Sequence, residues 1–242
     1  MARKPALAPT RTAESPDGLV ATTRASSVYA QLRADISHGT LEPGSKLRVE
    51  AMCKRYDVGA SPLREALSRL SAEGLVDRTD QRGFSVAALK WDELPILTRN
   101  RVQLESMALR ESIEARDGAW EDKLVLLVHR LARTPRSLSD EHYEPNPAWE
   151  SLHRDFHRAL LARCPSRWVR NFCDTLAEEA YRFRQLAAGK SFTKRNEHAE
   201  HEAIFEAAIA GHADEAVRLL AEHYNRTSML VATQARKLAQ PA

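Results

Sequence analysis

The hydrophobic pattern of the chain changes near Ala88, and this change most constrains the fold. Before it, helical spacing gives way to the alternation of short strands, whereas after it large apolar residues recur only at helical spacing. No apolar run approaches the roughly 20 residues that span a bilayer, and the opening "MARKPALAPT" lacks the apolar segment of a secretory signal. We therefore expect a mainly α protein of the cytoplasm, with a small mixed domain ahead of a helical one.

Composition narrows the function classes only a little. The net charge of +3 allows an anionic partner but does not require one. The three cysteines are an odd number without a CxxC spacing, which argues against a disulfide framework. Residues 1–25 are rich in proline, serine and threonine and contain few large apolar side chains, so they are predicted to form a flexible arm.

Residues 26–88 carry the pattern of a helix-turn-helix. A first helix is expected to stop at Gly39, and a short one spans 49–56. In a third helix, Ser61 is the expected N-cap and Pro62 the first helical residue. Its apolar face is formed by Leu63, Ala66, Leu67 and Leu70, whereas Arg64 and Arg69 lie on the polar face. Basic residues near the start of a second helix are typical of a recognition helix in the major groove.

Two strand-like stretches, "LVDRT" and "FSVAA", follow around the turn "DQRG" and predict a β-hairpin. A helix-turn-helix followed by a hairpin is a winged helix. Such units also serve as protein-interaction modules, and residues 26–88 hold nine Lys or Arg against eight Asp or Glu, a net charge of only +1. The placement of the charges, rather than their sum, therefore favours DNA.

The stretches "GTLEPGSKL", "SPLREALSRLSAEGLV" and "QRGFSV" resemble the N-terminal winged helix of GntR-type bacterial transcription regulators. The resemblance implies that Arg64 contacts DNA at the start of the recognition helix and that Arg82 and Gly83 form the wing tip, with Arg48 a weaker candidate. Gly59 and Ala60 stand where the family usually has Ser-Arg, so the resemblance implies that a base-reading arginine is missing at this position. The predicted DNA-binding residues are Arg48, Ser61, Arg64, Arg69, Arg82 and Gly83.

The remainder, residues 89–238, is predicted to be an all-α bundle of six or more helices. The expected helices span about 91–115, 118–134, 147–163, 167–188, 192–210 and 213–237. Turn-rich segments such as "PRSLSDEHYEPN" separate them.

Four histidines of this bundle interleave with the apolar stripes of their helices: His153, His157, His201 and His223. A single inward histidine is usually a hydrogen-bonded core residue. Four that converge would compete for protons or leave ring nitrogens unpaired, and a divalent metal resolves this by taking one nitrogen from each. Histidines four residues apart on a helix can bind one ion.

The stretches "RVQLESMALR", "HRDFHRALL" and "EHEAIFEAAIAG…AVRLLAEHYNRT" resemble the FCD domain, the helical effector-binding domain of FadR-like GntR regulators. The resemblance implies metal ligands from an Asp-x-x-x-His pair and from two later histidines, which here are His153, His157, His201 and His223. His153 stands in place of the usual aspartate, which would leave the charge of the metal uncompensated. Zinc is the expected ion, with nickel as an alternative.

By the same resemblance, Arg101 matches the carboxylate-binding arginine of the family. Arg184 or Arg182, in "YRFR", is the candidate for a second carboxylate, and the alternative is that these arginines form a solvated basic face. The implied effector is a small organic acid, such as a short dicarboxylate. The expected protein is thus a homodimeric regulator, a repressor, that releases double-stranded operator DNA when the acid binds. The alternative is a metal-dependent enzyme, with Glu150, Asp155 or Glu200 proposed as the general base.

Overall fold

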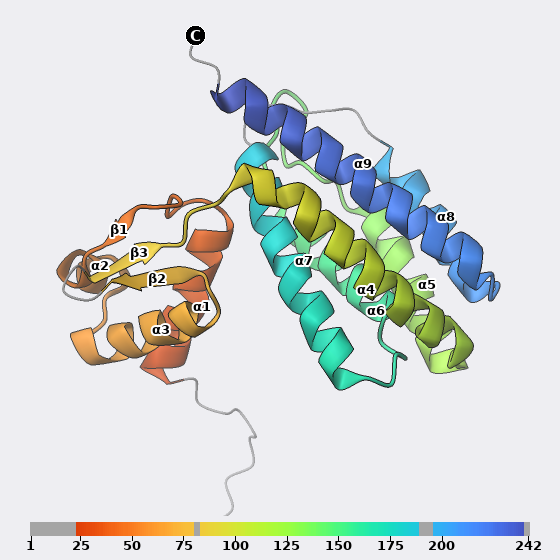
Figure 1. Cartoon of the computed structure of the whole chain (residues 1–242), viewed down its shortest axis with the longest axis horizontal. Coiled ribbons are helices and arrows are strands. Elements are labelled where there is room, and N and C mark those ends of the chain that lie inside the picture. Colours follow the sequence, from red (N-terminus) through yellow and green to blue (C-terminus); the bar gives the residue numbers. More distant parts are fainter. Residues whose placement is uncertain (1–22, 80–82, 189–195, 240–242) are drawn as a thin grey trace, which may run out of the picture.

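The computed structural model describes residues 23–79, 83–188 and 196–239. Three predicted features lie outside the described residues: the arm up to residue 22, the wing residue Arg82, and the start of a helix at Phe192. Figure 1 shows a small unit of helices and strands followed by a larger helical bundle. The predicted fold class, a mainly α chain with a winged helix ahead of an all-α bundle, is confirmed.

The N-terminal unit packs three helices against a small antiparallel sheet. Its elements are α1 (Arg24–Ser37), β1 (Lys46–Leu47), α2 (Val49–Tyr56), α3 (Ala60–Ala72), β2 (Val76–Thr79) and β3 (Gly83–Val86). The strand order is β1-β3-β2, with Lys46 opposite Ser85 and Val76 opposite Val86. The predicted apolar face of α3 is buried, together with residues of α1 and the sheet. Strand β1 was not predicted, because two residues are too few to show an alternating pattern.

The prediction that Ser61 caps α3 is wrong. The helix begins at Ala60, and Gly59 is the N-cap residue, without a side-chain hydrogen bond to the helix. Pro62 therefore lies inside the first turn rather than at the first position. This turn accepts proline because its backbone N–H groups have no partner within the helix.

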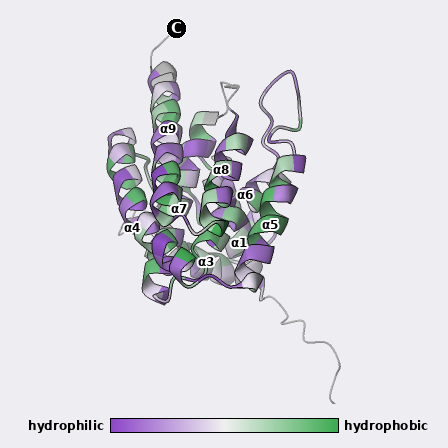
Figure 2. Ribbon diagram, turned by 90° about the vertical axis from the view of Figure 1, so that its right-hand side faces the viewer, coloured by the Kyte–Doolittle hydropathy of each residue, from purple (hydrophilic) through white to green (hydrophobic). Residues whose placement is uncertain are grey.

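The C-terminal bundle is built of long helices. Its elements are a 3-10 turn (Trp91–Glu93), α4 (Leu94–Glu114), α5 (Gly118–Arg133), α6 (Pro147–Leu160), α7 (Arg167–Ala188), α8 (Glu197–Ile209) and α9 (Ala213–Ala239). Helix α9 packs on α4, α7 and α8, while α5 packs on α6 and α8. Figure 2 shows hydrophobic and hydrophilic residues alternating along these helices. Among the described residues, no helix combines the length and apolar character needed to cross a membrane.

The first bundle helix starts later than predicted. Residues 91–93 form a separate 3-10 turn, and α4 begins at Leu94 with Pro95 in its first turn. Proline has no N–H to donate to the carbonyl of Trp91 four residues earlier. That carbonyl instead accepts a hydrogen bond from the N–H of Leu94, which gives the tighter turn.

Helix α1 ends as predicted at Gly39, which has a φ of +78°. The N–H of Gly39 donates to the carbonyl of Ile36 at 3.2 Å. This residue also faces the bundle, because a Cβ atom at Gly39 would lie 2.6 Å from Cδ2 of Leu186 on α7. Position 39 therefore requires glycine for two reasons: the left-handed backbone conformation and the close approach of the two domains.

We expect Gly39→Ala to lower the free energy of unfolding by about 1–2 kcal/mol, because alanine is strained in the left-handed region. Gly118→Ala is the matched control, since Gly118 opens α5 without a positive φ and has open space around it. That change should be neutral or slightly stabilising. Urea denaturation followed by circular dichroism measures both variants. Equal stability of the two would show that Gly39 is not required.

Candidate metal and effector site

Four histidines from three helices of the bundle face one another. His153 and His157 lie one turn apart on α6, His201 lies on α8 and His223 on α9. One ring nitrogen of each lies within 4.8 Å of those of the other three. His157, His201 and His223 are buried, and His153 is half-buried. The structure thus brings together the four side chains singled out from the sequence.

Asparagine caps set where two of these helices begin. The side chain of Asn146 accepts a hydrogen bond from the N–H of Ala148 at the start of α6, and Asn196 does the same for Ala199 at the start of α8. An N-cap satisfies backbone donors that the first turn leaves unpaired. The caps therefore help to fix the register in which the histidines reach the interior.

A chain of polar contacts orients the ring of His157. The hydroxyl of Tyr224 lies 2.5 Å from Oε2 of Glu105 and 3.0 Å from Nδ1 of His157. A carboxylate only accepts, so Tyr224 donates to Glu105 and accepts from Nδ1–H of His157. The lone pair of His157 is then on Nε2, which lies 3.2 Å from Nε2 of His153. Arg101 completes the chain, with Nε 2.8 Å from Glu105 and its guanidinium 4.0 Å over the ring of Tyr224.

A carboxylate orients His223 in the same way. Its Nδ1 lies 2.9 Å from Oε2 of Glu200, and the other oxygen of Glu200 accepts from Arg226 at 2.6 Å. Nδ1 of His223 therefore carries the proton, and Nε2 holds the lone pair. Metal-binding histidines are commonly held by such a bond from the nitrogen that does not face the metal.

The surroundings keep the rings of His153 and His157 neutral. Burial, followed by the positive charge of Arg184, lowers the pKa of His153 well below its ordinary value. Burial, followed by repulsion from His223, does the same to the pKa of His157. Burial and the neighbouring carboxylate of Glu105 raise the pKa of Tyr224, which keeps its proton. A neutral imidazole is the form that binds a metal, because its lone pair is free of a proton.

A cavity of about 330 Å³ opens beside the histidines. This volume is at the lower end of small-molecule sites, which span roughly 300–1,000 Å³. Its lining includes His153, His157, His223, Arg101, Glu105 and Arg184. A compact ligand inside it would face imidazole rings and cationic side chains together.

Each of the two expected effector-binding arginines already has a buried carboxylate partner. Arg101 pairs with Glu105 at 2.8 Å, and Arg184 pairs with Glu150 at 2.6 Å. Arg182, the alternative for the second carboxylate, is not among the residues that line the cavity. It donates instead to the carbonyl of Ala87 at 3.1 Å, between the two domains. That alternative is therefore not supported.

The four histidines suit a divalent ion. Four nitrogens placed tetrahedrally at zinc distances lie about 3.3 Å apart, close to the 3.2 Å between Nε2 of His153 and of His157. The widest spacing of 4.8 Å requires a small inward movement of the rings. Negative charge lies close to the four histidines, because Glu200 contacts His223 directly and Glu105 contacts His157 through Tyr224. Arg226 and Arg101 balance these two carboxylates.

The residues proposed as a general base of an enzyme are placed unfavourably. Glu150 is buried in its ion pair with Arg184, and Glu200 is held between His223 and Arg226. Asp155 lines a different hollow of the surface, together with residues of α5. None of the three is an uncommitted carboxylate facing the cavity beside the histidines.

The described DNA-binding candidates lie on the surface of the N-terminal unit. Arg48 is the N-cap residue of α2, Ser61 and Arg64 lie in the first part of α3, and Gly83 starts β3; all four are exposed. Arg69 is also exposed, but its guanidinium lies 4.0 Å over the ring of Tyr29 on α1. Arg69 is therefore turned toward α1.

Glu105 and Tyr224 were not predicted as site residues from the sequence. Their positions in the sequence could have indicated a role at the site. Glu105 follows Arg101 by four residues on one helix face, and Tyr224 directly follows His223. Neither spacing showed that the two side chains meet, since they lie 119 positions apart in the chain.

Comparison with known proteins places both domains. Residues 24–86 match the family of bacterial regulatory proteins named gntR, and residues 97–226 match the FCD domain. The E. coli McbR/YncC structure has a TM-score of 0.72 and 18% identity, covering 88% of this chain and 99% of that one. At this identity the likeness shows the fold alone.

Two similar proteins are regulators of transcription. The HTH-type transcriptional regulator BphR of Paraburkholderia xenovorans (strain LB400) is 38% identical over 210 residues, which are 85% of this chain and 84% of that protein. The HTH-type transcriptional repressor GlaR of Escherichia coli (strain K12) is 29% identical, over 81% of this chain and 90% of that protein. With a matching winged helix, a matching helical domain and relatives along most of its length, the chain belongs to the GntR family of bacterial DNA-binding transcription regulators, with a C-terminal FCD domain.

Proposed function

We propose that this regulator binds one divalent metal ion per chain through His153, His157, His201 and His223, and that a small organic acid bound there changes its affinity for operator DNA. The supporting observation is the convergence of four histidine nitrogens beside a cavity that also contains Arg101 and Arg184. Zinc fits this donor set best, and nickel is the alternative. When bound, the ion supplies a positive charge to which carboxylate oxygens can coordinate.

The residues of the chain prepare the cavity for an anion. Arg101 is held by Glu105 and by the ring of Tyr224, so its position does not depend on the ligand. Arg184 is held in the same manner by Glu150. Cationic groups that are already ordered bind an anion without the entropic cost of fixing long side chains.

Helix α3 is the proposed recognition helix that contacts operator DNA. A homodimer presents two such helices, which suits a pseudo-palindromic operator in double-stranded DNA. Repression is the expected mode, in line with the name of one relative. A regulator of this kind acts in the bacterial cytoplasm, where its operator lies.

The chain is not an enzyme. Its family and the named relatives are transcription regulators. The histidine cluster is therefore interpreted as a sensing site rather than a catalytic one.

Purified protein should hold about one zinc or nickel ion per chain, and His201→Ala should remove most of it, because each imidazole supplies one bond to the ion. His129→Ala is the control, since His129 is an exposed histidine on α5 outside the cluster. Elemental analysis of dialysed, zinc-reconstituted protein measures the content. Equal metal in His201→Ala and in the native protein would rule out this ligand.

Arg64→Ala should weaken operator binding by about 1–3 kcal/mol, because an arginine at the start of a recognition helix makes specific base contacts. Arg130→Ala, which removes an exposed arginine of α5, is the control and should leave the affinity unchanged. Fluorescence anisotropy with labelled operator at two salt concentrations measures both. An unchanged affinity in Arg64→Ala would remove this residue from recognition.

Arg101 is tested in a double variant, because Arg101→Ala alone would leave Glu105, only 2% exposed, without its counter-ion. Arg101→Met/Glu105→Gln removes both charges. It should keep operator binding and lose the response to the acid, whereas the control Arg110→Met, which removes an arginine of the same helix outside the cavity, should keep both. Anisotropy titrations with zinc and small carboxylates check this. A full response in the double variant would place the effector elsewhere.

A further inference from the structure

One wall of the cavity is shared with the contact between the two domains. Arg154 and Arg158 on α6 and Asp174, Glu178 and Tyr181 on α7 line the cavity beside the histidines. The same five residues also line a cleft between the bundle and the DNA-binding domain. Whatever occupies this end of the cavity is therefore one layer of side chains away from the DNA-binding domain.

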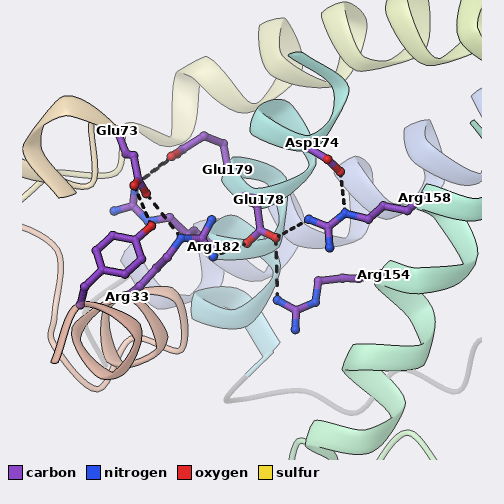
Figure 3. A network of polar contacts seen from close by, with 9 residues as sticks. Arg33, Glu73, Arg154, Arg158, Asp174, Glu178, Glu179 and Arg182 are labelled. Atoms are coloured by element: carbon purple, nitrogen blue, oxygen red, sulfur yellow. Dashed lines mark hydrogen bonds and ion pairs between the residues drawn. The ribbon is translucent and has the colours of Figure 1, made fainter. Parts of the chain in front are cut away.

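Glu178 is the centre of this shared wall. Its Oε1 lies 3.8 Å from Nη1 of Arg154 and 3.6 Å from Nη2 of Arg158, while its Oε2 lies 3.4 Å from Nη1 of Arg33 on α1. Figure 3 shows the carboxylate between the two bundle arginines and Arg33. One carboxylate thus holds two cations of the cavity and one cation of the DNA-binding domain.

The contacts continue through the DNA-binding domain to α3. Arg33 also lies 3.5 Å from Glu73, at the end of α3, and Glu73 accepts a 2.6 Å hydrogen bond from Tyr29. The guanidinium of Arg69, on α3, lies 4.0 Å over the ring of Tyr29. A second contact runs in parallel, since the ring of Tyr181 meets that of His38 at the end of α1, with 5.9 Å between centroids.

The arginines of this wall differ from the two deeper ones. Arg101 and Arg184 are committed to buried carboxylates at 2.8 and 2.6 Å. Arg154 and Arg158 are 39% and 52% exposed, and their nitrogens approach Glu178 no closer than 3.6 Å. Arg158 has a firm bond through Nε to Asp174, which leaves Nη2 directed at Glu178. Ion pairs with this exposure are weak, so an incoming anion can compete for these arginines.

We propose that Arg154 and Arg158 form a second anion-binding position, which takes the far carboxylate of a ligand whose near carboxylate lies at the histidine site. The ligand class is then a small organic acid with two anionic groups. The far carboxylate displaces Glu178 from the two arginines, and the contact of Glu178 with Arg33 changes as a consequence. This inference rests on the proposed function and adds the second recognition point and the route to the DNA-binding domain.

The second anion position is tested with zinc-loaded protein and matched probes. Succinate, glutarate and adipate are each compared with their monomethyl ester by calorimetry, because the ester keeps the length and loses one charge. At least one diacid should bind the native protein about tenfold or more tightly than its ester. In Arg154→Gln/Arg158→Gln this preference should fall below about threefold, and in the control Arg163→Gln, an exposed arginine outside the cavity, it should persist.

The outcomes separate this inference from the proposed function. Equal binding of diacid and ester by the native protein, or an undiminished preference in the double variant, would overturn the second anion position and leave the histidine site standing. If neither diacids nor esters bind the zinc-loaded native protein, the proposed function fails and the inference with it.

The route through Glu178 is tested separately. Glu178→Gln should bind the preferred diacid at least as tightly as the native protein, because the competing charge is gone, while operator release by that diacid should be largely lost. Glu179→Gln is the matched control, since Glu179 lines the cleft but not the cavity and pairs with Arg182. It should keep both properties. Operator release by Glu178→Gln equal to that of the native protein would disprove the route.

Discussion

Four imidazoles, three of them buried and one half-buried, pack against one another, and this packing constrains how α6, α8 and α9 are arranged. Burial and nearby positive charge lower the pKa of His153 and His157, so neither ring can relieve the crowding by taking up a proton. Tyr224 and Glu200 fix Nδ1 of the rings they contact, which turns the remaining lone pairs toward the centre. Lone pairs directed at one point repel one another, and a shared cation converts that repulsion into bonding.

The charges around this centre are paired before any ligand arrives. Arg101 with Glu105 and Arg184 with Glu150 are buried pairs, each with a nitrogen–oxygen distance below 3 Å. Removing one partner would leave the other charge buried alone, which is strongly unfavourable. Arg101 and Arg184 therefore line the cavity in fixed positions, which the packing of the bundle determines.

Helix α6 carries residues of both proposed ligand-binding positions. One part of its surface carries His153 and His157 toward the bundle interior, and another carries Arg154 and Arg158 toward α7 and the DNA-binding domain. The contacts inside the cavity are short and buried, whereas those around Glu178 are long and partly exposed. In the proposed mechanism, a ligand leaves the first set intact and rearranges the second, because partly exposed ion pairs are weak.

The spacing of residues within each helix and strand determined the secondary structure and the candidate metal ligands. Periodicity predicted the helices and the hairpin, and helical position singled out the four histidines, because both depend on spacing within one element. Tertiary structure decided which charges meet: Glu105 with Tyr224, and Glu178 with Arg33, join segments more than 100 residues apart. It also turned Arg182 to the domain contact rather than to the cavity. Spacing along one helix cannot predict such pairings, since they depend on how separate helices pack.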